Sequence, residues 1–240
     1  LELDLNYKVI GVMYDENGQP IYDGRDFVRN SKQFGVPQNR PRTYIMAFDR
    51  AHYGEELIRA LPNLLPDHND LNIYEDLNDL LEFGAEPRHY MSSGYLETLE
   101  RHRERQKANG NGFGYIVVNR PEVEHPIANT LLATGGSGKE RNLVFDPQDG
   151  IAGMIVPTKT TPLNAKGIRV MTPREWGKLQ GFIGYAFIEN GVDTFSFPEG
   201  ISDCQKYKQF GNSVTIPVIE TMARFMLECF EILGELANIE

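Results

Sequence analysis

Two arginines stand two positions apart in the segment FGVPQNRPR, residues 34–42. Pro41 disfavours the helical conformation for Arg40, and in the resulting extended backbone residues i and i+2 project from the same side. The guanidiniums of Arg40 and Arg42 are therefore expected to point together. The apolar run at 44–48 predicts a buried strand directly after them. This places the pair at the rim of a sheet, where ligands bind, although the alternative is two ordinary surface charges.

A glycine-rich segment and two cysteines could also suggest chemistry, but the spacing of neither matches a known site. The glycine-rich ATGGSGKE at 133–140 has Ala133 where a phosphate-binding loop needs glycine and Glu140 where it needs serine or threonine. This argues against a nucleotide triphosphatase. Cys204 and Cys229 lack metal-ligand spacing, and each follows a carboxylate residue that would raise the thiol pKa. We therefore predict no disulfide, no metal site and no nucleophilic cysteine.

Length and composition favour a soluble globular protein. The 240 residues suffice for one large domain or two small ones. The mean hydropathy is −0.41, and no run of about 18 apolar residues predicts a membrane span. The first residues, LELDLNYK, form neither a basic region nor an apolar leader. These features predict an intracellular, cytoplasmic protein.

The charge is distributed unevenly along the chain. The formal net charge of −10 argues against a nucleic-acid partner, because phosphate binding needs lysine and arginine. Acidic residues concentrate at 67–86, however, and RHRERQK at 101–107 is strongly basic. The basic run predicts either one basic face that binds phosphates or the solvated side of a helix.

Periodicity and turn signals predict the elements that position these residues. Helices are expected at 54–61, 73–83 and 93–108, after Thr172-Pro173, and from Pro217 onward. Short strands are expected at 7–13, 115–118, 128–132, 142–145 and 153–156. Glycine-rich connections link the strands of the second half, which indicates loop-rich β-structure between about 109 and 168.

Three separated blocks occur in a fixed order: FGVPQNRPR at 34–42, MTPREWGKLQGF at 171–182 and YKQFGNSVTIPV at 207–218. Together they resemble the C-terminal blocks of the DNA cytosine-5 methyltransferases, enzymes that flip a cytosine from the duplex and methylate its ring from S-adenosylmethionine. The matching positions are Gln38, Arg40, Arg42, Arg169, Pro173, Arg174, Glu175, Gly181, Phe182, Gln209, Gly211, Asn212 and Ser213. The resemblance covers nearly the whole chain.

The resemblance implies roles for the first and third blocks. Arg42 would contact the flipped cytosine, while Arg40 and Gln38 would help to form the catalytic pocket. Asn212 and Ser213 would approach the methionine end of S-adenosylmethionine. For these two residues the alternative is a helix cap, and both roles are compatible.

The resemblance also implies a surface that recognises DNA. The pair Thr130-Leu131 resembles one common in the family's recognition domains, although such a pair is usually plain strand. The glycine-flanked loop at 111–115, with Gly112, resembles one in members that read GC-rich sites. This favours a GC-rich palindrome over an AT-rich one. The further residues expected to contact DNA are Arg101, Arg103, Arg105, Lys107, Lys139, Arg141 and Arg169.

The chain departs from the family by lacking its Pro-Cys nucleophile block, its Glu-Asn-Val strand and its Phe-x-Gly-x-Gly cofactor loop. The expected fold is therefore the C-terminal part of an α/β S-adenosylmethionine-dependent methyltransferase with an inserted, irregular, β-rich target-recognition domain. Residues 1–50 would end the catalytic domain, 51–168 would form the recognition domain, and 169–240 would return to the catalytic domain with a C-terminal helix.

Two functions of different class remain open. The chain is either a portion or subunit of a restriction-modification methyltransferase, inactive alone and completed by the N-terminal portion, or a stand-alone DNA-binding module. The intact first and third blocks favour the methyltransferase, because a pure binder has no use for them. A protein without any DNA role rests on the acidic charge alone.

Overall fold

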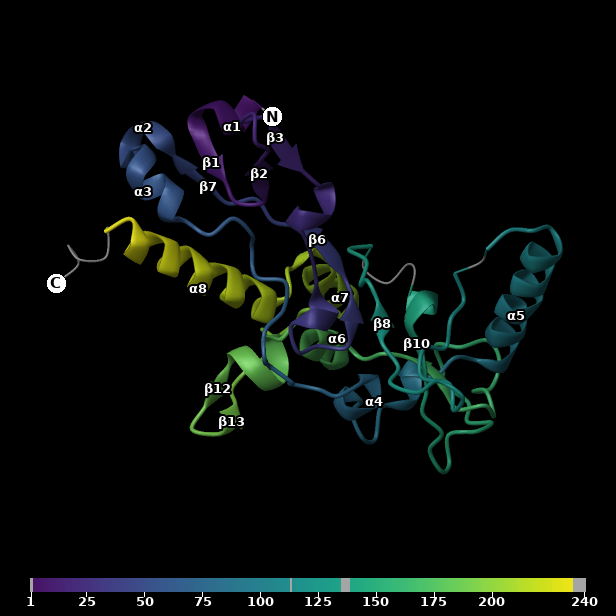
Figure 1. Cartoon of the computed structure of the whole chain (residues 1–240). Helices are drawn as coiled ribbons and strands as arrows, with labels where there is room; N and C mark the ends of the chain where they lie inside the picture. The colour runs from purple at the N-terminus through teal and green to yellow at the C-terminus, as the bar shows by residue number, and fades with distance from the viewer. Residues whose placement is uncertain (1, 113, 135–138, 235–240) are drawn as a thin grey trace.

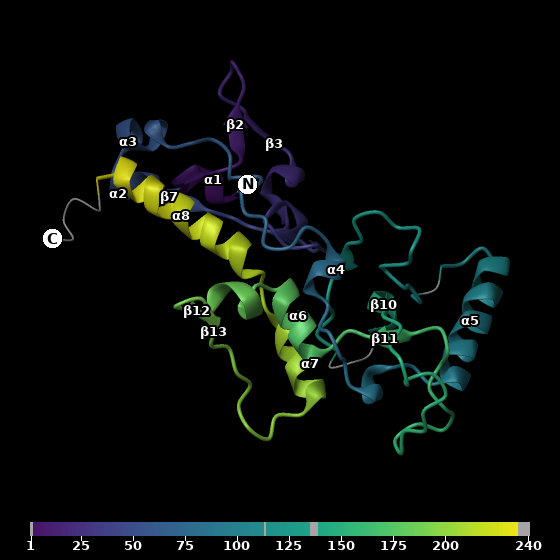
Figure 2. The ribbon, with the colours of Figure 1, turned by 90° about the horizontal axis from the view of Figure 1, so that it is seen from below.

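The computed structural model describes residues 2–112, 114–134 and 139–234. Figures 1 and 2 show two halves, with the N-terminal elements and the last helix in one and the segment around 85–170 in the other. Two helices, α6 (Pro173–Leu179) and α7 (Asp203–Asn212), lie between the halves in both views. In the described part of the chain, no helix is long and apolar enough to cross a membrane.

The first half is built from short antiparallel pairs and helices. Strand β1 (Tyr7–Val9) pairs with β7 (Ala47–Asp49), β2 (Val12–Tyr14) with β3 (Pro20–Tyr22), and β4 (Val28–Asn30) with β6 (Pro41–Thr43). The helices are α1 (Glu2–Asn6), α2 (Arg50–Tyr53), α3 (Glu55–Ala60) and the long α8 (Ile216–Ile232). Single turns of 3₁₀ helix occur at η1 (Gly24–Phe27) and η2 (Ser31–Gln33).

One apolar core joins α8 to this half. Its buried residues are Ile10, Phe34, Phe48, Ile58, Leu61, Leu65, Val218, Met222, Phe225, Cys229 and Leu233. Ile58, Leu61 and Leu65 lie beyond residue 50, where the catalytic part was expected to end. These three residues pack with α8, so the contacts of this core continue past residue 50.

A second core surrounds α6 and α7. Trp176 and Leu179 of α6 pack with Tyr207 and Phe210 of α7, and Trp176 meets Tyr207 edge to face at 4.8 Å between ring centroids. The same core buries Leu77 and Leu80 of α4 (Leu77–Leu80). A turn, η5 (Phe182–Ala186), and the hairpin of β12 (Ile188–Glu189) and β13 (Val192–Asp193) follow α6.

The other half has one long helix and scattered ladders. Helix α5 (Ser93–Ala108) buries Leu96 and Leu99 against residues of the 115–117 segment. Strand β10 (Leu143–Phe145) pairs with β11 (Ile168–Val170), and β8 (Ala128–Asn129) runs parallel to β5 (Gln38–Asn39). Short 3₁₀ turns occur at η3 (Pro87–His89) and η4 (Lys139–Asn142).

Helices were predicted more accurately than strands. Helix α5 has the predicted bounds, and α6 begins with the predicted capping box of Thr172 and Glu175. The helix predicted at 73–83 is confined to α4, and the strand predicted at 7–13 breaks at Gly11, which has a φ of +106°. No strand forms at 153–156. Of the 44–48 run, Ala47 and the buried Phe48 lie in β7, whereas Ile45 is 62% exposed and lies outside any strand.

Candidate functional site

The guanidinium of Arg40 joins three separate segments of the chain near the centre of the molecule. Its Nη1 donates to the carbonyl oxygen of Leu131 at 2.9 Å. Its Nη2 donates to the carbonyl oxygens of Gly211 at 2.9 Å and Ser213 at 2.6 Å. One buried side chain thus ties the first block to the third block and to Leu131, which lies in the segment expected to recognise DNA.

A polar network beside Arg40 brings in the second block. Gln38 Nε2 donates to the carbonyl of Leu179, the last residue of α6. Gln180, which is fully buried, donates through Nε2 to the Phe210 carbonyl and accepts from the Thr215 hydroxyl through Oε1. The first block therefore meets the second and third blocks, which lie more than a hundred residues further along the chain. Sequence reasoning quoted Gln180 within its block without assigning it a role.

The environment of Arg40 is unusual for an arginine. Burial, together with the nearby charge of Arg42, lowers the pKa of Arg40 to about 10. Among the described side chains, Arg40 Nε is the buried polar atom without a hydrogen-bond partner. The Nη donors of Arg40 are taken by backbone, and Gln38 is fully buried. Arg40 and Gln38 were expected to be catalytic residues, but both side chains are bonded to backbone carbonyls and hold the surrounding backbone in position.

Arg42 differs from Arg40 in exposure and partners. It lies in β6 opposite Arg29, is half-buried, and donates through Nη1 to the carbonyl of the adjacent Pro41 at 2.7 Å. The expectation that the two guanidiniums serve one ligand together is wrong, because Arg40 is held inside by three carbonyls. Arg42 remains as the arginine of this block with donors near the surface.

Arg169 is sequestered, which corrects its expected contact with DNA. Its fully buried guanidinium forms a bidentate pair with Glu175 at 2.7 and 2.8 Å, and its Nε donates to Asp146 at 2.6 Å. Burial alone would lower the pKa of Arg169, but the bonds and charges of Glu175 and Asp146 outweigh burial and raise it. Arg169 therefore joins β11 to α6 inside the protein.

The proposed cofactor residues lie between α7 and α8. Asn212 is exposed at the end of α7, and the Ser213 hydroxyl donates to the Phe210 carbonyl at 2.8 Å. Ser213 caps the C-terminus of α7, whereas Thr215 begins α8. The helix-cap alternative therefore applies to the end of α7, and the polar side chain of Asn212 remains open to solvent.

A groove of about 520 Å³ brings several of the expected DNA contacts together, and we call it the Arg141 groove. Its lining residues are Asn39, Pro41, Gly112, Gly114, Ile116, Asn129, Thr130, Leu132 and Arg141. The Thr130 hydroxyl donates to the Asn39 carbonyl at 2.7 Å, so the groove borders the first block directly. Sequence reasoning missed Asn39 and Asn129, because single asparagines carry no motif signal.

The remaining expected DNA contacts lie outside this groove. The Leu131 side chain is buried. Lys139 lies over the ring of Tyr207 at 3.9 Å, and burial lowers its pKa. Arg101, Arg103, Arg105 and Lys107 are exposed along α5. Phe113 and residues 135–138, which belong to two of the loops named from sequence, fall outside the described residues.

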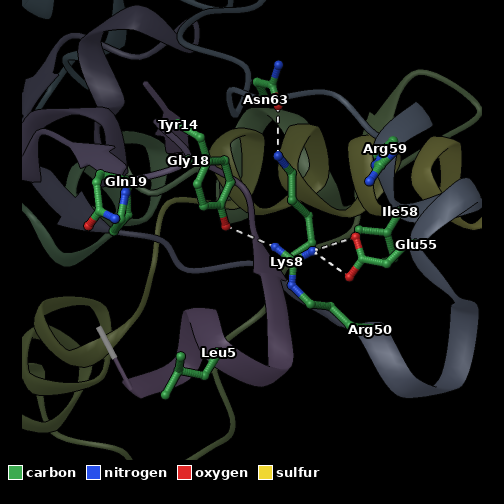
Figure 3. Close-up of a pocket in the computed structure, with 11 residues that line it drawn as sticks. Leu5, Lys8, Tyr14, Gly18, Gln19, Arg50, Glu55, Ile58, Arg59 and Asn63 are labelled. Carbon is green, nitrogen blue, oxygen red and sulfur yellow. Dashed lines mark hydrogen bonds and ion pairs between the residues drawn. The ribbon is translucent and has the colours of Figure 1, made fainter. Parts of the chain in front are cut away.

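A second cavity, of about 730 Å³, is lined by residues outside the three blocks (Figure 3). Lys8 points into it from β1 and donates to Asn63 Oδ1 at 2.8 Å, while Arg50 pairs with Glu55 at 3.1 Å. None of the residues expected at the site lines this cavity. In the described residues, no group of His, Cys, Asp and Glu side chains is arranged to hold a metal ion.

The close approach of Gly211 to the recognition segment predicts a large effect of a single methyl group. A Cβ at Gly211 would lie 2.3 Å from the Leu132 carbonyl oxygen. Because that neighbour is backbone, we expect Gly211→Ala to lower the free energy of unfolding by about 1–3 kcal/mol. Urea unfolding of Gly24→Ala is the control, since a Cβ at Gly24 meets nothing within 4 Å. Equal midpoints for the two variants would contradict the packing described.

Comparison with known proteins identifies the family of the chain. Residues 6–228 match the family of C-5 cytosine-specific DNA methylases. The chain is 36% identical to the type II methyltransferase M.HpaII of Haemophilus parainfluenzae, over 83% of this chain and 49% of that protein. It is 30% identical to M1.ScrFI of Lactococcus lactis subsp. cremoris, over 88% of this chain and 44% of that protein. The chain thus spans about half the length of these relatives.

The fold is shared with a solved methyltransferase. The structure of EhMeth from Entamoeba histolytica superposes with a TM-score of 0.54 at 16% identity, over 96% of this chain and 55% of that one. The family match and the relatives cover most of this chain. The chain belongs to the C-5 cytosine-specific DNA methylase family.

Proposed function

We propose that this chain is the C-terminal portion or a subunit of a DNA (cytosine-5)-methyltransferase of a restriction-modification system. It recognises a DNA site and completes the pockets for the flipped cytosine and S-adenosylmethionine. The observation that carries the proposal is the junction at Arg40, where the recognition segment, the first block and the third block are held together.

The composition of the Arg141 groove supports DNA as the ligand. Among the described residues that line it there is no carboxylate, and Arg141 supplies a positive charge. Four other cavities of the described structure each include at least one aspartate or glutamate, in a chain with 34 acidic residues. A carboxylate-free groove in an acidic protein suits a polyanion, because carboxylates would repel phosphates.

Helix α5 carries exposed cations on more than one side. Arg103 stacks over the ring of Tyr115 at 4.8 Å, and Tyr115 lies between Gly114 and Ile116 of the groove wall. Arg103 therefore lies against the ring of Tyr115, which packs with Leu96 and Leu99 of α5. We propose that Arg103, with Arg101, Arg105 and Lys107 along the same helix, contacts phosphates, while Gly112, Thr130 and Arg141 face the duplex within the groove.

On the substrate side, Arg42 supplies the donors of the first block. A flipped cytosine presents its O2 and N3 as acceptors, and Arg42 is the member of the block whose guanidinium is near the surface. We propose that Arg42 binds the base, while Arg40 and Gln38 hold the backbone around it.

Asn212 and Ser213 fit the polar end of S-adenosylmethionine, which supplies the methyl group when bound. Asn212 presents an exposed amide, and the backbone around it is fixed by the bonds from Arg40 to Gly211 and Ser213. An amide donor and acceptor held on a fixed backbone suits the amino and carboxylate groups of a methionine moiety. We propose that these residues hold that end.

We also propose a domain organisation adjusted to the packing. The catalytic part comprises the residues up to about 65, which pack with α8, together with α8 itself. The recognition part begins after residue 65 and includes α5 and the ladders up to β11. Helices α6 and α7 form the joint between the two parts.

The proposal predicts complementation. The chain alone is expected to transfer no methyl group to DNA, because it lacks the Pro-Cys and Phe-x-Gly-x-Gly blocks. A polypeptide that carries those blocks should restore transfer by docking on the β1 and β7 pair and on α8. The measurement is incorporation of labelled methyl groups with the chain alone and with the mixture.

Either of two outcomes would count against this prediction. Methyl transfer by the purified chain alone would show that its nucleophile had been misidentified. An inactive mixture, together with sequence-selective DNA binding by the chain, would favour the stand-alone DNA-binding module.

A further inference from the structure

Arg141 carries the charge of the Arg141 groove and leaves its donors available. Its side chain is exposed, and within the described residues its guanidinium makes no hydrogen bond or ion pair. We propose that Arg141 reads a guanine base of the recognition site, donating to O6 and N7 at the major-groove edge. This inference rests on the proposed function and names the base class that the groove selects.

The backbone that bears Arg141 is fixed from both sides. The Ile116 N–H donates to the Glu140 carbonyl at 2.8 Å, and Asn129 Nδ2 donates to the carbonyl of Arg141 at 2.9 Å. Asn142 and Asn129 also exchange two bonds, of 2.7 and 3.1 Å. A side chain on a fixed backbone loses less entropy on binding, so its contact distinguishes one base from another more sharply.

Gly114 makes room for the side chain of Arg141. A Cβ at Gly114 would lie 2.8 Å from Arg141 Nε and 3.2 Å from its Cγ. The guanidinium therefore lies along the glycine loop, where any larger residue would displace it. Because the clash would be with a flexible side chain, Gly114→Ala should redirect Arg141 at little cost in stability.

The lining of the groove favours a base edge over the phosphate backbone. Proteins that bind along phosphates need several cations in a row, whereas this groove has Arg141 among asparagines, a threonine and apolar residues. The planar fork of arginine matches the two acceptors of guanine, which is the commonest base-specific contact in the major groove. A lone arginine in a polar and apolar groove is thus arranged for guanine.

The test begins with selection of duplexes by the full chain from a randomised library, followed by affinity measurements on the selected duplex. Each guanine of that duplex is replaced in turn by 7-deazaguanine, which lacks the N7 acceptor. At one position the replacement should weaken binding by wild type about tenfold and should not weaken binding by Arg141→Ala further. Arg141→Lys and Gly114→Ala should relax the selected sequence at that position. Arg120→Ala is the control, since Arg120 is an exposed arginine paired with Glu122.

The outcomes separate this inference from the proposed function. The inference fails if no 7-deazaguanine replacement weakens binding by wild type. It also fails if Arg141→Ala weakens binding to every duplex equally and reduces the slope of log affinity against log salt concentration by about one, because Arg141 then contacts a phosphate. If the chain selects no sequence and binds no duplex, the proposed DNA recognition fails and the inference fails with it. Selective binding with one sensitive guanine supports both.

Discussion

Arg169→Ala is expected to lower the free energy of unfolding by about 3–5 kcal/mol. The substitution would leave the Glu175 carboxylate buried without its cation, and Asp146 would lose a bond of 2.6 Å. A buried charge without its partner destabilises the folded state by more than the intact pair stabilises it, so removing one partner lowers the free energy of unfolding strongly. The measurement is the midpoint of urea unfolding, followed by circular dichroism.

Arg174→Ala provides a matched control in the same segment. Arg174 pairs with Glu82 at 2.9 Å, but both side chains are partly exposed. Exposed pairs contribute at most about 1 kcal/mol, so this variant should unfold close to wild type. Similar losses in the two variants would show that the Arg169 pair is not the buried junction described.

Arg40→Ala and Arg42→Ala are expected to fail in different ways. Loss of Arg40 removes the donors to three carbonyl oxygens, two of them in buried surroundings, and should cost about 3 kcal/mol or more of unfolding free energy. Arg40→Lys should recover little, because a lysine lacks the planar fork that reaches separate carbonyls. Arg42→Ala should change stability by less than about 0.5 kcal/mol.

In the complete enzyme, Arg42→Ala is expected to impair methyl transfer directly, although it has the smaller effect on stability. Arg42→Ala should reduce methyl transfer about a hundredfold or more at unchanged stability, since it removes a donor to the flipped base. Urea unfolding and labelled-methyl assays on both variants measure the two effects. If Arg42→Ala unfolds readily, or if Arg40→Ala is as stable as wild type, the assignment of positioning to Arg40 is wrong.

The helices could be predicted because their signals are local. The capping box at Thr172 and the apolar stripe of α8 lie within a few residues of one another, and both elements form close to where they were expected. The strands depend on distant partners: Gln38 pairs with Ala128, and Tyr7 pairs with Asp49. No local pattern specifies such pairings, so the sheet topology was not predictable.

The candidate site was predictable as a set of blocks but not as a set of roles. The sequence places Arg40 and Arg42 in one motif, yet it does not reveal that three carbonyls from positions 131, 211 and 213 surround Arg40. Arg169 likewise looks like any surface arginine until Asp146 and Glu175 are brought to it by the fold. Burial arises from long-range packing, and burial decides which charged groups remain available.

All three partners of the Arg40 guanidinium are main-chain oxygens, which every amino acid possesses. Side chains on the recognition segment can therefore be exchanged during evolution without changing what Arg40 binds at Leu131. The three hydrogen bonds of Arg40 can therefore hold recognition segments of different sequence in one position relative to Gly211 and Ser213. A hybrid protein that receives its recognition segment from a relative should keep this attachment, provided that the exchanged piece preserves the path of the backbone through residue 131.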